Sequence, residues 1–310
     1  VGPSANSDVP TTDILGNARS GATANPGAFE QPQATATITK TIGPSGRDYT
    51  TFTLAEADVT NIGGSADLVN ENERIVFEAD AGTYTGAVTF SSTLVTDATR
   101  NVTYRAASGA EHGGQSAQGV ILSNTGGVVT IGDDFISLVQ LNIQSGGIAI
   151  FPQGDGSVID SCRISGASYG IVNYVYATGV APVQKVTNCV FFGASSTAPA
   201  IDARGPFNSG ATARYLIVNC TAFGHHTFCR HGTSGVAGST CEVALINNWV
   251  GDTGSSYYTS GASTIVLTGS NNFGGSTNPF PVAIQGSPYP ITASTAYDPG
   301  AGDFALYVGK

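Results

Sequence analysis

The segment GHHTFCRHG (224–232) concentrates side chains that could bind a metal, namely His225, His226, Cys229 and His231. Imidazole and thiolate groups are ligands that zinc favours. Their spacing matches no tetrahedral zinc motif, and a disulfide at Cys229 would remove one ligand. We therefore expect a surface turn without metal or cofactor, and these four residues remain candidates only if a metal is found.

Two of the five cysteines, Cys229 and Cys241, lie outside the repeat described below. They close a glycine-rich loop, which makes a disulfide geometrically easy. Such a bridge would stabilise the fold by about 2–3 kcal/mol. It would also require an oxidising compartment.

The aspartates offer no clear catalytic pair, although sugar-cleaving enzymes need paired carboxylates or a calcium-binding cluster with a basic residue. Asp133 and Asp134 are adjacent, so on a strand they would face opposite sides. Asp202 and Arg204 suggest an ordinary surface ion pair. Asp155 and Asp160 are scattered. We predict no catalytic residue.

Two tyrosine-rich segments, YGIVNYVY (169–176) and SSYYTS (255–260), interrupt the repeat. Tyrosine provides rigid amphipathic contact area that suits a sugar ring. The same side chains would also suit the flank of a solenoid or a subunit interface. The sequence leaves these interpretations open.

A repeat organises the middle of the chain. Its anchor is an apolar or Cys position with apolar residues on both sides and a glycine soon after. The anchors at 141, 162, 189, 220 and, in a weaker copy with Asn at this position, 248 are 21, 27, 31 and 28 residues apart. Apolar residues two apart share one face of a strand, and a three-residue step marks a bend. Variable spacing is typical of solenoids, whose loops grow without disturbing the stack.

Stacking of these copies predicts two columns of side chains. Cys162, Cys189 and Cys220 would line the interior as small apolar residues. The polar residues in the bends would form an amide ladder along the stack, at Asn188, Asn219 and Asn247.

The copies VTNCVFFG (186–193) and IVNCTAFG (217–224) resemble coils of the pectate-lyase-like right-handed β-helix superfamily. IVFEADAGTYTGAVTF (75–90) resembles its opening coil. GPSGRDYTTFTLAEADV (43–59) resembles the capping helix of phage structural and bacterial surface proteins. The resemblance covers roughly 37–275 and implies an all-β, right-handed parallel β-helix. IGDDF (131–135) and RHG (230–232) are similar to polygalacturonase motifs, but they lie much more than one coil apart.

Composition agrees with many short strands, because the chain has 41 glycines and only 11% charged residues. The net charge of −10 argues against nucleic acid and against an anionic membrane surface as partners. No apolar run is long enough for membrane insertion.

The chain is expected to have four parts. Residues 1–36 form an extended N-terminal arm. Residues 37–64 hold a strand (37–42) and a short capping helix around 54–59. Residues 65–275 form the β-helix, and the proline-rich residues 276–310 close it.

The arm has an unusual sequence for its position. SDVPTTDILGNARSGATANPGAFE (7–30) resembles the final segment of bacterial surface β-helix domains, and DPGAGDFALYVGK (298–310) resembles what precedes that segment. The chain could be one unit of a tandem array, or a subunit whose arm completes its neighbour, or it could carry the remnant of an upstream domain. The residues that would make such an assembly arm are Asp13, Gly16, Arg19, Phe29 and Glu30.

These observations favour a non-enzymatic structural protein. It would be part of a virion, extracellular filament or surface layer, and it would assemble with itself as a trimer or head-to-tail polymer. The alternatives are a polysaccharide depolymerase, by lyase or hydrolase chemistry, and a carbohydrate-binding adhesin that contacts a surface polysaccharide. All of them place the protein outside the cell, on its surface or on a virus particle.

Overall fold

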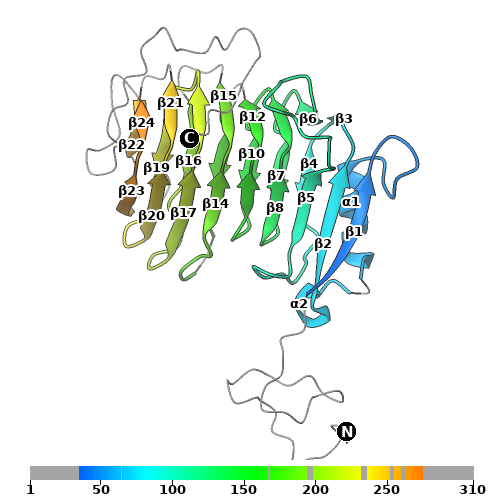
Figure 1. Cartoon of the computed structure of the whole chain (residues 1–310). Coiled ribbons are helices and arrows are strands. Elements are labelled where there is room, and N and C mark those ends of the chain that lie inside the picture. The colour runs from blue at the N-terminus through cyan, green and yellow to red at the C-terminus, as the bar shows by residue number, and fades with distance from the viewer. Residues whose placement is uncertain are drawn as a thin grey trace, which may run out of the picture. The chain divides into compact units, whose positions relative to one another are not determined.

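The computed structural model describes residues 35–63, 65–166, 168–176, 178–193, 198–231, 236–251, 255–259 and 263–274. The chain divides into two compact units, Val1–Ala36 and Thr37–Lys310. The second unit contains the coils, whose strands stand side by side in Figure 1. The predicted arm residues (Asp13, Gly16, Arg19, Phe29 and Glu30) and the closing segment 276–310 lie outside the described residues.

A strand and short helices precede the coils: β1 (Ala36–Ile42), α1 (Phe52–Asp58), the 3-10 turn η2 (Val59–Asn61) and α2 (Leu68–Glu71). The Thr51 hydroxyl accepts a hydrogen bond from the Leu54 amide (3.2 Å) and caps α1. The helix therefore begins earlier than the sequence predicted. Phe52 is buried and its ring lies 5.2 Å from that of Tyr84. The helix thus covers the core at the first coil.

The described strands form three sheets. Each sheet is named below after the strand that the first coil contributes to it, which is β2, β3 or β4. The β2 sheet contains β1, β2 (Glu73–Ala79), β5 (Val102–Ala106), β8 (Ile136–Val139), β11 (Val158–Asp160), β14 (Gln184–Thr187), β17 (Thr212–Val218), β20 (Thr240–Ile246) and β23 (Thr264–Ser270). The β3 sheet contains β3 (Gly82–Thr85), β6 (Val120–Asn124), β9 (Asn142–Ser145), β12 (Arg163–Gly166), β15 (Val190–Gly193), β18 (Thr221–Phe223), β21 (Trp249–Gly251) and β24 (Phe273–Gly274). The β4 sheet contains β4 (Val88–Phe90), β7 (Val129–Ile131), β10 (Ile150–Pro152), β13 (Ile171–Asn173), β16 (Pro199–Ala203), β19 (Thr227–His231) and β22 (Ser255–Thr259).

Each coil supplies one strand to each sheet, and neighbouring coils pair in parallel, as β11 does with β8 and β14. Parallel crossovers are right-handed for steric reasons. The predicted right-handed parallel β-helix is therefore confirmed, with the short helix near its beginning. No helix in the described part of the chain is long and apolar enough to cross a membrane.

The bend between the β2 and β3 sheets is built by one residue in the left-handed conformation. Its φ angle is between 53° and 59° at Gln140, Ser161, Asn188, Asn219, Asn247 and Asn271. Asparagine tolerates this conformation better than most residues do, which explains the polar position in the repeat. The residue after each bend points inward and is fully buried or nearly so, as Cys162, Cys189 and Cys220 are.

The amide ladder expected at the bends is present. Asn219 Nδ2 donates to Asn188 Oδ1 (3.1 Å), and Asn247 Nδ2 donates to Asn219 Oδ1 (2.7 Å). Asn188 in turn donates to Asp160 Oδ1 (2.8 Å). A buried amide pair replaces the thiols in the last described coils, where Asn248 Nδ2 donates to Asn272 Oδ1 (2.9 Å).

Candidate functional site

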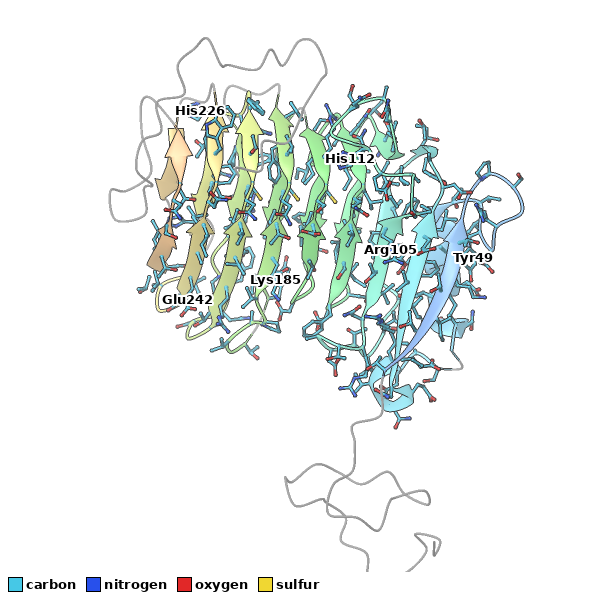
Figure 2. The ribbon with its side chains drawn as sticks, viewed as in Figure 1. Tyr49, Arg105, His112, Lys185, His226 and Glu242 are labelled. Atoms are coloured by element: carbon cyan, nitrogen blue, oxygen red, sulfur yellow. The ribbon has the colours of Figure 1, made fainter. Side chains whose placement is uncertain are left out.

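The histidine-rich segment does not gather its side chains at one point. Cys229 and His231 belong to β19 and are fully buried. His225 is buried before the strand, with its ring over Gly193, and His226 is exposed (Figure 2). Burial lowers the pKa of both His225 and His231 to about 4, so both are neutral at pH 7. Among the described residues, no group of three His, Cys, Asp or Glu side chains could hold a metal.

The predicted disulfide between Cys229 and Cys241 is wrong, because neither residue forms a disulfide and both are buried. The sequence suggested that they lie outside the repeat and close a glycine-rich loop, but both lie on strands of the coils. Cys229 is in β19 of the β4 sheet, and Cys241 is in β20 of the β2 sheet, where its Sγ donates to the Ala203 carbonyl (3.7 Å). Burial raises the pKa of Cys229 well above its usual value.

Asp133 and Asp134 follow β7, and both accept hydrogen bonds from backbone amides. Asp133 accepts hydrogen bonds from the Ser92 amide (2.7 Å), the Ser92 hydroxyl (2.9 Å) and the Thr93 amide (3.1 Å). Asp134 Oδ1 accepts from the Asp155 amide (2.7 Å). Burial, with Asp134 nearby, raises the pKa of Asp155 to about 6. These carboxylates connect neighbouring coils rather than forming a paired acid and base.

The strongest cluster of charge lies on the outer face of the β4 sheet and centres on Asp202, which is 0% exposed. Arg230 binds it from the next coil with two bonds, Nε to Oδ1 (3.1 Å) and Nη2 to Oδ2 (2.7 Å). Arg204 adds a third bond from Nε to Oδ2 (2.9 Å). Asp202 and Arg230 are opposite each other in the β16–β19 pairing, so the strand register creates this contact.

Both arginines keep partial access to solvent, with side-chain exposures of 16% for Arg204 and 24% for Arg230. The hydrogen bonds that Arg230 donates to Asp202 raise the pKa of Arg230 above its usual value, so this group stays charged. One carboxylate therefore balances two guanidinium groups. These three side chains together therefore carry a net positive charge, in a chain whose overall charge is −10.

Aromatic rings surround the two arginines. The Arg204 guanidinium lies 4.1 Å from the centre of the Tyr174 ring and also bonds the Tyr174 hydroxyl. Phe207 stacks on Tyr174 at 5.3 Å and on Tyr176 at 5.3 Å. Arg230 Nη2 donates to the Tyr169 hydroxyl (3.4 Å). Tyr176 is 55% exposed, so this edge of the aromatic group faces solvent.

The sequence identified parts of this site but not the whole. It named Asp202 with Arg204 and the tyrosine-rich segment 169–176, but interpreted the ion pair as a surface feature. In the structure Asp202 is buried and Arg230 is its second partner. The sequence analysis had noted Arg230 only as part of the RHG motif. Recognising that partnership required the pairing of β16 with β19. Aligning the coils at the glycine after each anchor would not have found it, because Asp202 lies nine residues after Gly193 and Arg230 only six after Gly224.

Comparison with known proteins shows similarity in structure rather than in sequence. No family model matches the chain, and no curated protein matches it in sequence. A pectin methylesterase mutant in complex with a hexasaccharide aligns over 89% of this chain and 97% of its own, at 9% identity and a TM-score of 0.47. The pectin methylesterase from Aspergillus niger aligns over 86% and 94%, at 15% identity and 0.46. Escherichia coli YbhC aligns over 83% and 72%, at 14% identity and 0.42.

These likenesses concern the fold alone, which is a parallel β-helix as the repeat predicted. The prediction of a non-enzymatic structural protein is contradicted, because the structures it resembles include enzymes named for pectin, one of them holding a hexasaccharide. The polysaccharide-directed alternative agrees better with them. The likeness to phage structural proteins has no support among them.

Proposed function

We propose that the chain acts on an acidic polysaccharide outside the cell and holds it on the outer face of the β4 sheet. The observation that carries this proposal is the buried Asp202 with two partly exposed arginines. A guanidinium group binds a carboxylate through two parallel N–H donors. Asp202 fixes the orientation of both groups before any ligand arrives, which lowers the entropic cost of binding.

The unused donors of the arginines define where the ligand would bind. Within the described residues, Arg230 uses Nε and Nη2 on Asp202, and Arg204 uses Nε on Asp202 and Nη1 on Tyr174. Arg230 Nη1 and Arg204 Nη2 are then available for the carboxylate of a uronic acid. The exposed Tyr176 ring, stacked on Phe207, offers an apolar surface for a neighbouring sugar.

The reaction that this arrangement supports is β-elimination. An arginine that neutralises the sugar carboxylate makes the proton on the adjacent carbon more acidic. The hydroxyl of Tyr169 or Tyr174 is bonded to a guanidinium, which places it beside the arginines as the candidate base that takes this proton. The C–H bond and the glycosidic C–O bond break, a carbon–carbon double bond forms, and the leaving oxygen takes up a proton. Hydrolysis by two carboxylates is disfavoured, because Asp202 is buried and paired with both arginines.

The test is incubation of the full chain with a panel of polyuronates, following the ultraviolet absorbance of an unsaturated product. Arg230→Lys should lower the rate at least tenfold, since lysine cannot keep both bonds to Asp202 and still bind the sugar. Arg214→Lys is the matched control on the exposed face of the β2 sheet, where Arg214 pairs with Glu242. Equal rates in the two variants would contradict the proposed site.

Binding without cleavage is the second candidate, and one observation favours it. Among the described residues, Asp202 is the only carboxylate in an ion pair with Arg204 or Arg230. Affinity electrophoresis in gels that contain a polyuronate separates the two functions. Retardation that Arg230→Lys abolishes, without any unsaturated product, would identify a binding protein.

A further inference from the structure

The outer face of the β3 sheet has a different chemistry from the Asp202 site. Strand register aligns one outward position through successive coils. It is occupied by hydroxyl and amide side chains in the first coils and by aromatic rings later: Thr85, Ser123, Gln144, Ser165, Phe192 and Phe223. The neighbouring outward position carries Arg163 and, three coils later, Trp249. Neither row contains a carboxylate among the described residues.

The single tryptophan of the chain lies across the outward side of a glycine. A Cβ atom added to Gly251 would lie 2.7 Å from Trp249 Cη2, so the absence of a side chain at 251 lets the indole lie down on the sheet. The Phe223 ring stands beside it, at 5.0 Å and 65°. Trp249 remains partly exposed. A flat, partly exposed indole is a surface on which a sugar ring can stack.

The other end of the strip is a hollow of about 460 Å³. Its lining consists almost entirely of hydroxyl and amide side chains and glycine: Thr85, Gly86, Ser123, Asn124, Thr125, Gln144, Ser145, Gly146 and Ser165. Gln144 Nε2 is held by the Ser116 carbonyl (2.5 Å). Its Oε1 makes no bond within the described part of the chain and can accept one from a ligand hydroxyl.

Arg163 and Phe192 connect the hollow to the aromatic end. The Arg163 guanidinium lies 4.5 Å from the centre of the Phe192 ring, and Phe192 stacks on Phe223 at 5.7 Å. Arg163 is only 8% exposed and bonds Asn142 Oδ1 (3.3 Å). It therefore supports the aromatic row rather than offering a free charge to a ligand.

We propose that this strip, from Thr85 to Trp249, is a second glycan-binding surface, for a linear neutral polysaccharide that lies along the stack of coils. Coils repeat every ~4.8 Å, so the six steps of the strip span about 29 Å, enough for several sugar residues. Hydroxyl and amide groups would bond the sugar hydroxyls, and Trp249 would stack on one ring. The absence of carboxylates and of a free cation in these rows selects against an acidic chain.

The single tryptophan makes a direct test possible in the full chain. Its fluorescence is titrated with soluble β-glucan, mannan and xylan fragments, and a saturable change in emission is expected with one of them. Ser123→Ile fills the hollow with a residue that suits a strand, and should weaken the apparent affinity at least tenfold. Ser137→Ile makes the same change on the outer face of the β2 sheet and should leave the affinity unchanged.

Trp249→Ala, measured by affinity electrophoresis in the same glycan, should also weaken binding at least tenfold. If that variant fails to fold, the comparison of Ser123→Ile with Ser137→Ile still tests the proposal. The proposal is overturned if no neutral glycan changes the emission, or if the two serine variants behave alike. It is also overturned if emission changes with protein concentration alone, since a second copy would then cover the strip. Arg230→Lys should leave neutral-glycan binding intact. A failure of this proposal can therefore be told apart from a failure of the proposed Asp202 site.

Discussion

Two regions join neighbouring coils through polar side chains, and they do so differently. The amide ladder places the same residue at the same bend in successive coils, at Asn188, Asn219 and Asn247. The Asp202 cluster joins two coils through different residues, a carboxylate on one and Arg230 on the next. The ladder repeats with the coil, whereas the cluster occurs once among the described residues.

The difference separates structural roles from functional ones. A polar residue that recurs in successive coils has a structural explanation, because each of these coils contains the same left-handed bend and the side-chain amide there bonds a neighbouring coil. A departure from the repeat has no such explanation, and burying Asp202 carries a desolvation cost that its pairing with the two arginines helps to offset. Departures from a solenoid repeat are therefore the first places to look for a site.

Asp202→Asn tests this contrast with the largest expected effect. It removes the charge that two partly buried arginines share, and breaking such a pair costs about 3–5 kcal/mol of unfolding free energy. Urea unfolding at pH 7 measures the loss. Glu242→Gln breaks the exposed pair with Arg214, whose side chains are 43% and 46% exposed, and should cost no more than about 1 kcal/mol. Similar losses for the two variants would show that Asp202 is not buried as described.

Asn219→Ala should cost about 1–2 kcal/mol, because it removes both ladder bonds and places alanine at a φ of 55°. Asn219→Gly removes the same bonds but suits the left-handed conformation. The glycine variant should therefore lose less, and the difference measured by urea unfolding gives the cost of the bend. If glycine is the worse of the two, conformation does not explain the preference for asparagine.

Asp155 belongs to neither region, and its Oδ1 is buried without a hydrogen bond in the described structure. Its pKa rises from 3.8 to about 6 on folding, so its contribution to stability is full below pH 4 and is lost as the pH rises through 6. Asp155→Asn should therefore stabilise the protein at pH 7, by on the order of 1 kcal/mol after allowance for its partial exposure, and much less at pH 4. Thermal unfolding of both proteins across this range gives the difference. An equal effect at both pH values would contradict the raised pKa.

The smallest expected effect is none, and it concerns the cysteines. None of the five forms a disulfide and all are buried, so thiol titration of the unfolded chain should find five thiols with or without reductant. The midpoint of urea unfolding should not depend on reductant. If reductant instead lowered the unfolding free energy by about 2–3 kcal/mol, the loss expected for a disulfide that closes a short loop, a bridge between Cys229 and Cys241 would be indicated.

The sequence alone determined what repeats locally. The bend residues, the inward cysteines at 162, 189 and 220 and the amide ladder all follow from apolar spacing and from the preference of asparagine for a left-handed bend. Within each copy these signals lie only a few residues apart, so they need no knowledge of the rest of the chain. The capping helix was also visible, although its start shifted to the Thr51 cap.

Only the tertiary structure decided which residues of different coils meet. The spacing of the anchors varies between 21 and 31 residues, because loops of different length separate the strands. Counting along the chain therefore does not reveal that Arg230 lies opposite Asp202, or that Cys229 and Cys241 point into the core. The hollow on the β3 sheet likewise exists only after the coils stack. Strand register, set by packing of the whole core, fixes these contacts.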